Sequence, residues 1–388
     1  MIEKYVESLC GEVQSEKCKM QSEKCKMQSA KCRVQSAECK VQSAECKVQS
    51  EKCRVQSAEC RVQSIESIYL GGGTPSILNI KQITQIFEVL QDNFDLSETK
   101  EVTFEANPEH LTEKYLSDLK KYTPVNRLSI GIQSFFQDDL DFLMRRHLSE
   151  NAHKAIENAL KLGFSNLTVD FIYGMPTLTD EKLLQNLQIA IDYGIEHISA
   201  YGLTIEPKTI LHQSFLRKRS SHCYEELENK IARQYLLIHT FLTQNAFEHY
   251  ETSNFAKNKK YSLHNTNYWN RTNYIGFGAS AHSLTDDMRS WNESDVERYC
   301  ENVRKDYEVL SPCDKYNEYV MTAIRTMWGI DPAYLSDNFP DFIRHFNKQI
   351  SCIPKEYIQL KNNKLQTTLS GSLFADKIAE ILFLSNAE

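Results

Sequence analysis

The sequence predicts an α/β fold of parallel strand–helix units, and two observations lead to this prediction. Short apolar runs alternate with amphipathic segments of helical length from Ile65 to Leu203, a pattern typical of parallel β/α units. The predicted strands also end in glycine or polar residues, namely Gly71–Thr74, Glu105 with Asn107, Gln133, Asp170, and Thr204 with Glu206. Because ligands bind at the carboxyl ends of parallel strands, these residues predict one cleft for a polar ligand.

The overall charge and the hydropathy pattern argue against two classes of partner. The formal net charge is -7 and there is no long basic tract, so nothing points to nucleic acid. No apolar run is long enough to span a bilayer, and the N-terminal residues Met1–Lys4 do not begin the apolar core of a signal peptide. We therefore expect a cytoplasmic protein with no integral membrane segment.

The first 64 residues divide into a helix and a repeat. Ile2, Val6 and Leu9 share one face of a helix predicted over residues 1–13. Zinc and iron–sulfur sites draw on cysteines two to four residues apart. Residues 14–64 instead repeat a heptapeptide, which places its cysteines seven residues apart, at Cys18, Cys25, Cys32, Cys39, Cys46, Cys53 and Cys60. We therefore predict no metal site in the array, which is either a weakly amphipathic helix or a disordered spacer.

Strands and helices alternate in the part of the chain that follows. Apolar runs predict strands at Ile65–Leu70, Glu101–Glu105, Arg127–Ile132, Leu167–Tyr173 and His197–Leu203. Apolar residues at helical spacing predict helices at Asn79–Phe94, Leu111–Tyr122, Asn151–Leu162 and Asp180–Tyr193. Gly163 and Gly194 follow the last two of these helices and act as C-terminal stops.

The region after Thr204 is richer in aromatic residues. A long amphipathic helix is predicted at Glu225–Gln244, and three polar and aromatic stretches follow it, at Tyr250–Ala256, His264–Trp269 and Gly276–His282. His264 is a candidate metal or haem ligand, with a hydrogen-bonded structural histidine as the alternative.

The last part of the chain, from Asp314 to Glu388, predicts a small helical domain. Helices are expected at Tyr319–Met327, Phe339–Gln349 and Asp376–Phe383, with a short strand at Lys364–Thr368. This arrangement is similar to a winged helix. It does not imply DNA binding, because no basic recognition helix stands out.

Taken in order, these motifs resemble the radical S-adenosylmethionine family, and within it the coproporphyrinogen III oxidase-like branch of haem chaperones (HemW-like). The resemblance covers the chain from about Ile65 to the C-terminus. It rests on Gly71–Ser76, Glu105–Pro108, Arg127–Phe135, Arg145–His147, Asp170–Pro176, His197–Ser199, Tyr250–Ala256, His264–Asn265, Tyr268–Trp269 and Gly276–Gly278.

The resemblance implies a partial (β/α) barrel with S-adenosylmethionine across its strand ends. It places that cofactor among Gly72, Gly73, Thr74, Glu105, Gln133, Arg145, Asp170 and Thr204. It also implies a [4Fe-4S] cluster, haem as a ligand with His264 as the candidate residue, and a protein that accepts haem. The expected organisation is a helix over 1–13, the array over 14–64, the barrel and its extension over 65–300, and a helical domain over 301–388.

One departure from the family concerns the cluster. The family's barrel opens with a strand and a C-x3-C-x2-C loop whose cysteines hold the cluster, and the 12 cysteines of this chain include no such triplet. The resemblance therefore implies that the chain as given begins after that strand and loop, through a late start codon or a split gene rather than a decayed paralogue. We expect it to lack the cluster, and to leave the edge of its first strand open to pairing.

Three functions stay open at this point. The first is a haem-chaperone type of radical S-adenosylmethionine protein that binds the cofactor and haem. The second is an oxygen-independent coproporphyrinogen III oxidase-like enzyme of porphyrin biosynthesis. The third is an inactive remnant, or an interaction protein that uses the cysteine array.

Overall fold

The computed structural model describes residues 1–16, 64–205 and 221–384, with side chains described from residue 225 onward in the last range. The predicted array over 14–64 therefore lies almost entirely outside the described residues, as does Glu206. Within the described ranges, no helix combines the length and the apolar character that a membrane span requires.

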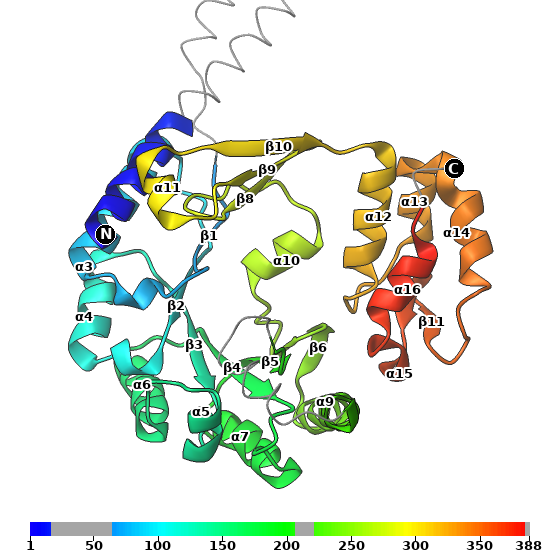
Figure 1. Cartoon of the computed structure of the whole chain (residues 1–388), viewed down its shortest axis with the longest axis horizontal. Helices are drawn as coiled ribbons and strands as arrows, with labels where there is room; N and C mark the ends of the chain where they lie inside the picture. Colours follow the sequence, from blue (N-terminus) through cyan, green and yellow to red (C-terminus); the bar gives the residue numbers. More distant parts are fainter. Residues whose placement is uncertain (17–63, 206–220, 385–388) are drawn as a thin grey trace, which may run out of the picture.

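Seven strands form one curled sheet in the order β1-β2-β3-β4-β5-β7-β6 (Figure 1). The first five are parallel, as the sequence predicts: β1 (Ser67–Leu70), β2 (Glu101–Ala106), β3 (Arg127–Gln133), β4 (Leu167–Tyr173) and β5 (His197–Gly202). Two antiparallel strands extend the sheet, β6 (Glu248–Glu251) and β7 (Asn254–Ala256). Strand β1 is at one end of this order, so its outer edge pairs with no other strand of the described chain.

Helices cover the convex side of the curled sheet in Figure 1: α3 (Ile80–Asn93), α4 (Glu113–Tyr122), α5 (Gln137–Phe142), α6 (Ser149–Lys161), α7 (Asp180–Asp192) and α9 (Ser221–Gln244). Their apolar faces form the main core with the sheet, which buries Ile83, Leu116, Ile156 and Leu187. Helix α4 begins two residues later than predicted, because the Thr112 side chain caps its first turn by accepting from the backbone N–H of Tyr115.

No helices or strands were predicted from the sequence between Tyr250 and Asp314. This region contains α10 (Leu263–Trp269), which lies on the concave side of the sheet (Figure 1), and α11 (Val296–Glu301). It also contains a second, antiparallel sheet of β8 (His282–Thr285), β9 (Met288–Asn292) and β10 (Lys305–Val309). Because β10 pairs with β9, the chain on the two sides of residue 301 shares one sheet.

The C-terminal part is helical, as predicted, but several details differ: α13 (Pro332–Asn338) was not predicted, and the helix predicted at Phe339–Gln349 begins only at Ile343. The helix expected at Tyr319–Met327 is α12 (Pro312–Ala323), which starts earlier because Ser311 and Asp314 form a capping box. A strand was also missed, because β11 (Ile358–Lys361) pairs with β12 (Lys364–Thr367) in a hairpin. The remaining elements are α14 (Ile343–Ile350), α15 (Leu369–Ser372) and α16 (Ala375–Leu382).

The N-terminal helix packs against α3 on one side and against the region of Gly278 and Tyr299 on the other. Residues 2–16 are helical, and Val6 and Cys10 pack against Ile86 of α3. On its other side, the buried carboxylate of Glu12 accepts hydrogen bonds of 2.8 Å from the Tyr299 hydroxyl and of 2.9 Å from the backbone N–H of Gly278.

Candidate functional site

The glycine turn after β1 lies directly against the end of β2. The backbone N–H of Gly72, a residue with φ of 82°, donates to a carboxylate oxygen of Glu105 at 3.3 Å. At Gly71, an added Cβ would lie 2.5 Å from the Tyr69 ring and 2.7 Å from the other Glu105 oxygen. Glycine is therefore required there for close approach of the two strand ends.

Glu105 and Tyr69 form one hydrogen-bonded unit. The Tyr69 hydroxyl donates to Glu105 at 2.7 Å. Burial, followed by the nearby charge of Glu105, raises the pKa of Tyr69, so its hydroxyl stays protonated and donates. Glu105 thus keeps carboxylate lone pairs for a ligand that carries N–H or O–H donors.

Asp170, on β4, faces the same interior. Burial raises its pKa to about 6, while a hydrogen bond from Ser199 lowers it and the charge of Glu105 raises it. The Ser129 hydroxyl donates to Asp170 at 3.2 Å. A carboxyl group that is this poorly solvated gains from a cationic ligand, which would stabilise its ionised form.

Gln133 ends β3 in an unusual conformation. Its φ is 66°, and its side chain is 8% exposed. A Cβ added at Gly131 would lie 2.9 Å from the Gln133 amide nitrogen, so the Gln133 side chain lies across the glycine. A non-glycine residue with positive φ costs about 1–2 kcal/mol, and such strain is concentrated at functional sites.

Arg145 and Thr74 line a cavity of about 450 Å³ next to these strand ends. Its other lining residues include Asn107, Glu109 and His147. Desolvation lowers the pKa of the Arg145 guanidinium, whereas the charges of Glu109 and Asp170 raise it. One buried carboxylate oxygen of Glu109 has no hydrogen-bond partner. Arg146 also lines the cavity, which therefore offers two guanidinium groups, and the Glu109 oxygen lies 3.6 Å from Nδ1 of His147.

Two of the predicted cofactor residues make no described side-chain contact with the other members of the set. Gly73 is exposed, and a Cβ added there would meet nothing within 4 Å. The Thr204 hydroxyl donates only to the carbonyl of Gly202, at 3.5 Å, and the side chain is exposed. The structure thus groups Gly72, Glu105 and Asp170 around Tyr69, and places Thr74 with Arg145 in the cavity.

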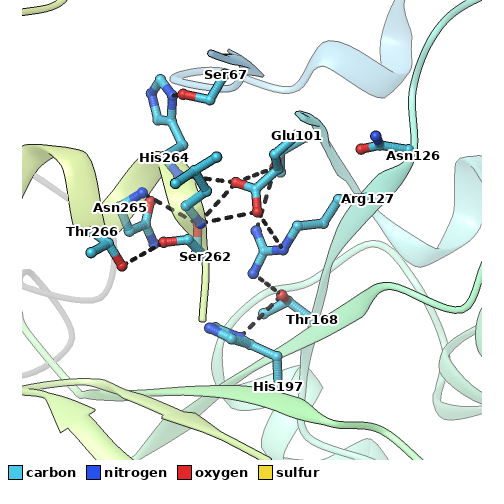
Figure 2. Close-up of polar contacts among 12 residues, drawn as sticks. Ser67, Glu101, Asn126, Arg127, Thr168, His197, Ser262, His264, Asn265 and Thr266 are labelled. Carbon is cyan, nitrogen blue, oxygen red and sulfur yellow. Dashed lines mark hydrogen bonds and ion pairs between the residues drawn. The ribbon is translucent and has the colours of Figure 1, made fainter. Parts of the chain in front are cut away.

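His264, the candidate haem ligand, lies on α10 beside β1 (Figure 2). Its Nδ1 is 3.0 Å from the Ser67 hydroxyl, and its Nε2 is 3.3 Å from the Tyr268 hydroxyl. Its ring stacks on Tyr69, with centroids 5.0 Å apart. Burial lowers its pKa to about 4, against the charge of Glu101, so the imidazole is neutral at pH 7. Tyr69 therefore contacts both His264 and the carboxylate of Glu105.

Sequence reasoning missed the polar residues further inside the curled sheet. Side chains at every second position of a strand share a face. In β1 to β5 these positions carry Ser67 and Tyr69, Glu101, Thr103 and Glu105, Arg127 and Ser129, Thr168 and Asp170, and His197 and Ser199. This period-two pattern of polar residues was visible in the sequence and marks a polar inner face rather than a plain apolar core.

A metal cluster has no evident ligand set within the described residues. No three His, Cys, Asp or Glu side chains gather there in a way that could hold a metal ion. The cysteines with described side chains are Cys10, Cys300, Cys313 and Cys352, all as free thiols.

Comparison with known proteins agrees with the sequence motifs. A family model described as the radical SAM superfamily matches residues 51–190. The heme chaperone HemW of Buchnera aphidicola subsp. Schizaphis graminum is 31% identical over 324 residues, which cover 82% of this chain and 84% of that protein. HemW of Bacillus subtilis is 31% identical over 286 residues, which cover 71% and 73% of the two chains.

A solved structure shows the same fold. Coproporphyrinogen III oxidase (HemN) from Escherichia coli, described as a radical SAM enzyme, superposes with a TM-score of 0.65. The superposition covers 82% of this chain and 78% of that one, at 20% sequence identity. The likeness confirms the predicted partial-barrel fold class.

Proposed function

The chain belongs to the HemW family of radical S-adenosylmethionine haem chaperones, and from this premise we propose that it binds S-adenosylmethionine at the strand ends and haem at His264. In this proposal haem is held for transfer to an acceptor protein. The observation that carries the proposal is the pair of polar sites on one inner face, which share Tyr69 between Glu105 and His264.

The strand-end residues match the chemistry of S-adenosylmethionine. Its ammonium and ribose hydroxyls are donors, which suits the carboxylates of Glu105 and Asp170. Its carboxylate suits Arg145. We assign Gly72, Gly73, Thr74, Gln133 and Thr204 as further contacts of the nucleotide and methionine. The positive charges of this cofactor would stabilise the ionised carboxylate of Asp170, which is poorly solvated because it is buried.

Reductive cleavage of the cofactor is no part of the proposal. It requires an electron from an iron–sulfur cluster, and the sequence as given contains no C-x3-C-x2-C triplet. The described residues also offer no group of three ligands. Binding of S-adenosylmethionine and of haem is proposed on the residues that are present.

His264 supplies the iron ligand in this proposal. We assign the neutral imidazole the tautomer in which Nδ1–H donates to Ser67 and the Nε2 lone pair is directed toward Tyr268. Tyr268 is 44% exposed, so its side chain can move toward solvent and free Nε2 for iron. Ser67 and the Tyr69 stack hold the ring in place during this exchange.

A haem titration followed by visible absorption tests the assignment. We expect the full chain to bind one haem, and His264→Ala to lose at least about tenfold in affinity, equivalent to about 1.4 kcal/mol. His282→Ala is the matched control, because His282 is an exposed histidine on β8. Equal binding by the His264→Ala and His282→Ala variants would contradict the assignment. With a C-x3-C-x2-C segment added and its cluster reconstituted, an anaerobic assay with coproporphyrinogen III should show no turnover, which separates the chaperone from an oxidase.

A further inference from the structure

A closed ring of buried polar contacts lies at the base of α10, and Figure 2 shows the part of it that runs from His197 through Arg127 and Glu101 to Ser262. The ring passes through strands β2 to β6 and returns to the residue that precedes α10. Its members are Glu101, Arg127, Thr168, His197, Tyr250 and Ser262, none of them more than 6% exposed.

Glu101 joins this ring to the first turn of α10. Its carboxylate accepts from the backbone N–H groups of Leu263 and His264, each at 3.0 Å, and from the Ser262 hydroxyl at 3.4 Å. The same carboxylate lies 3.8 Å from Nε of Arg127. The first N–H groups of a helix have no acceptor within the helix, so Glu101 provides one from a distant part of the chain.

The other half of the ring returns to Ser262. Arg127 donates to the Thr168 hydroxyl at 2.5 Å, and that hydroxyl lies 3.1 Å from Nδ1 of His197. Nε2 of His197 is 2.8 Å from the Tyr250 hydroxyl, which accepts from the backbone N–H of Ser262 at 3.4 Å. Five strands and α10 are thus linked through one continuous set of contacts.

Apolar packing does little to fix α10 in place. The helix has seven residues, and none of them is buried. A helix this short is not stable on its own. A buried ion pair is also weak evidence for stability, because desolvation of the two charges offsets their attraction. The Glu101–Arg127 pair is therefore better explained by its role in anchoring α10 than by a contribution of the ion pair itself to the free energy of unfolding.

We propose that the buried Glu101–Arg127 pair is the positioning device for His264: it fixes the first turn of α10, and thereby places the His264 ring between Ser67 and Tyr69 of β1. The haem part of this inference rests on the proposed function. Glu101 and Arg127 do not touch haem in this arrangement; they act through the backbone of α10.

The test is a charge-balanced double variant, Glu101→Leu with Arg127→Met, in the full chain. Removing both members of a buried pair leaves neither charge unpaired, so this variant is expected to fold, with a melting temperature lowered by the loss of the acceptor for the first amides of α10. The matched control is Glu113→Leu with Lys161→Met, which removes an exposed ion pair of 2.9 Å. Three properties are measured: hydrogen exchange of the Leu263 and His264 amides, haem affinity, and the visible absorption spectrum of bound haem.

We expect the two amides to exchange at least about tenfold faster in the first double variant, with haem affinity lower by about tenfold or more and a changed absorption spectrum. The control should match the parent in all three. Unchanged protection of both amides, or unchanged haem affinity and spectrum, overturns the inference. A parent chain that binds no haem overturns the proposed function instead, and amide exchange then decides whether the pair holds α10.

A second variant applies if the double variant does not fold. Glu101→Asp keeps the negative charge beside Arg127 but shortens the side chain by one methylene, which draws the carboxylate away from α10. We expect faster exchange of the Leu263 and His264 amides in this variant as well. Exchange at the parent rate in Glu101→Asp overturns the inference, because the reach of Glu101 would then not matter.

Discussion

At the scale of single residues, the inner face depends on contacts that leave no room for an added atom. Gly71 is the clearest case, because a Cβ there would come within 2.5 Å of the Tyr69 ring and 2.7 Å of Glu105. The Tyr69 ring cannot move freely, since it stacks on His264 and its hydroxyl is bonded to Glu105.

We therefore expect Gly71→Ala to lower the free energy of unfolding by about 1–3 kcal/mol, the usual cost of overpacking. Urea denaturation measures the change. Gly73→Ala is the control two residues along the same turn, where an added Cβ would meet nothing within 4 Å. If the two variants were equally stable, the close approach of β1 and β2 would not be as described.

Asp170 should give the molecule a distinct pH dependence. Burial raises its pKa to about 6, whereas an unfolded aspartate titrates near pH 4. Between these values the native chain binds more protons than the unfolded chain. This carboxyl group therefore makes the free energy of unfolding fall as the pH rises, by about 3 kcal/mol in all.

Asp170→Asn should remove that contribution, so that its stability relative to the parent increases from about pH 4 to about pH 6. Denaturation curves across this range measure the difference. Asp306→Asn, at an exposed position on β10, should parallel the parent. A constant difference between the parent and Asp170→Asn at every pH would show that the Asp170 carboxyl is not poorly solvated.

At the scale of helices and strands, the repeating units were predictable and the connecting region was not. The five parallel strands and the helices α3, α6 and α7 follow from hydrophobic periodicity and glycine stops, because each buries a continuous apolar face. Helix α10 has no such face. It depends on Glu101, which is 162 residues away from Leu263 in the chain, and no local pattern predicts such a contact.

The candidate site was predictable only in part, from the residues at the ends of the predicted strands. Strand ends are recognised by the residue that follows an apolar run, which identified Glu105, Gln133 and Asp170. Tyr69 and Ser129 were missed because they stand inside strands, where polar alternation was the relevant signal. The contact between Ser67 and His264 joins residues 197 positions apart, so the sequence alone could not pair them.

The N-terminal helix provides a prediction at this scale. Its residue Glu12 is 4% exposed and accepts from the Tyr299 hydroxyl at 2.8 Å, and Lys305 lies 3.3 Å away. Glu12→Ala would leave the Tyr299 hydroxyl and the Gly278 N–H without this acceptor, whereas Lys305 keeps its 3.2 Å contact with Glu16, so we expect a loss of about 1–3 kcal/mol in the free energy of unfolding. Glu7→Ala, on the exposed side of the same helix, should change it by less than about 0.5 kcal/mol. Chemical denaturation of both variants decides the matter, and a Glu12→Ala variant as stable as Glu7→Ala would count against this docking.

At the scale of the whole molecule, one curled sheet carries both candidate sites on its inner face. The C-terminal part is tied to the same region, because Met327 donates to the backbone carbonyl of Tyr250 at 2.9 Å. The Tyr250 hydroxyl in turn belongs to the polar ring that anchors α10. The two candidate sites lie next to each other, because Tyr69 contacts both Glu105 and His264.

The most direct measurement is one equilibrium experiment with S-adenosylmethionine and haem together on the full chain. The proposed function predicts one equivalent of each bound at the same time, with Asp170→Asn weakening S-adenosylmethionine alone and His264→Ala weakening haem alone. Displacement of one ligand by the other, or loss of both ligands in either variant, would contradict two separate sites on the inner face of the sheet.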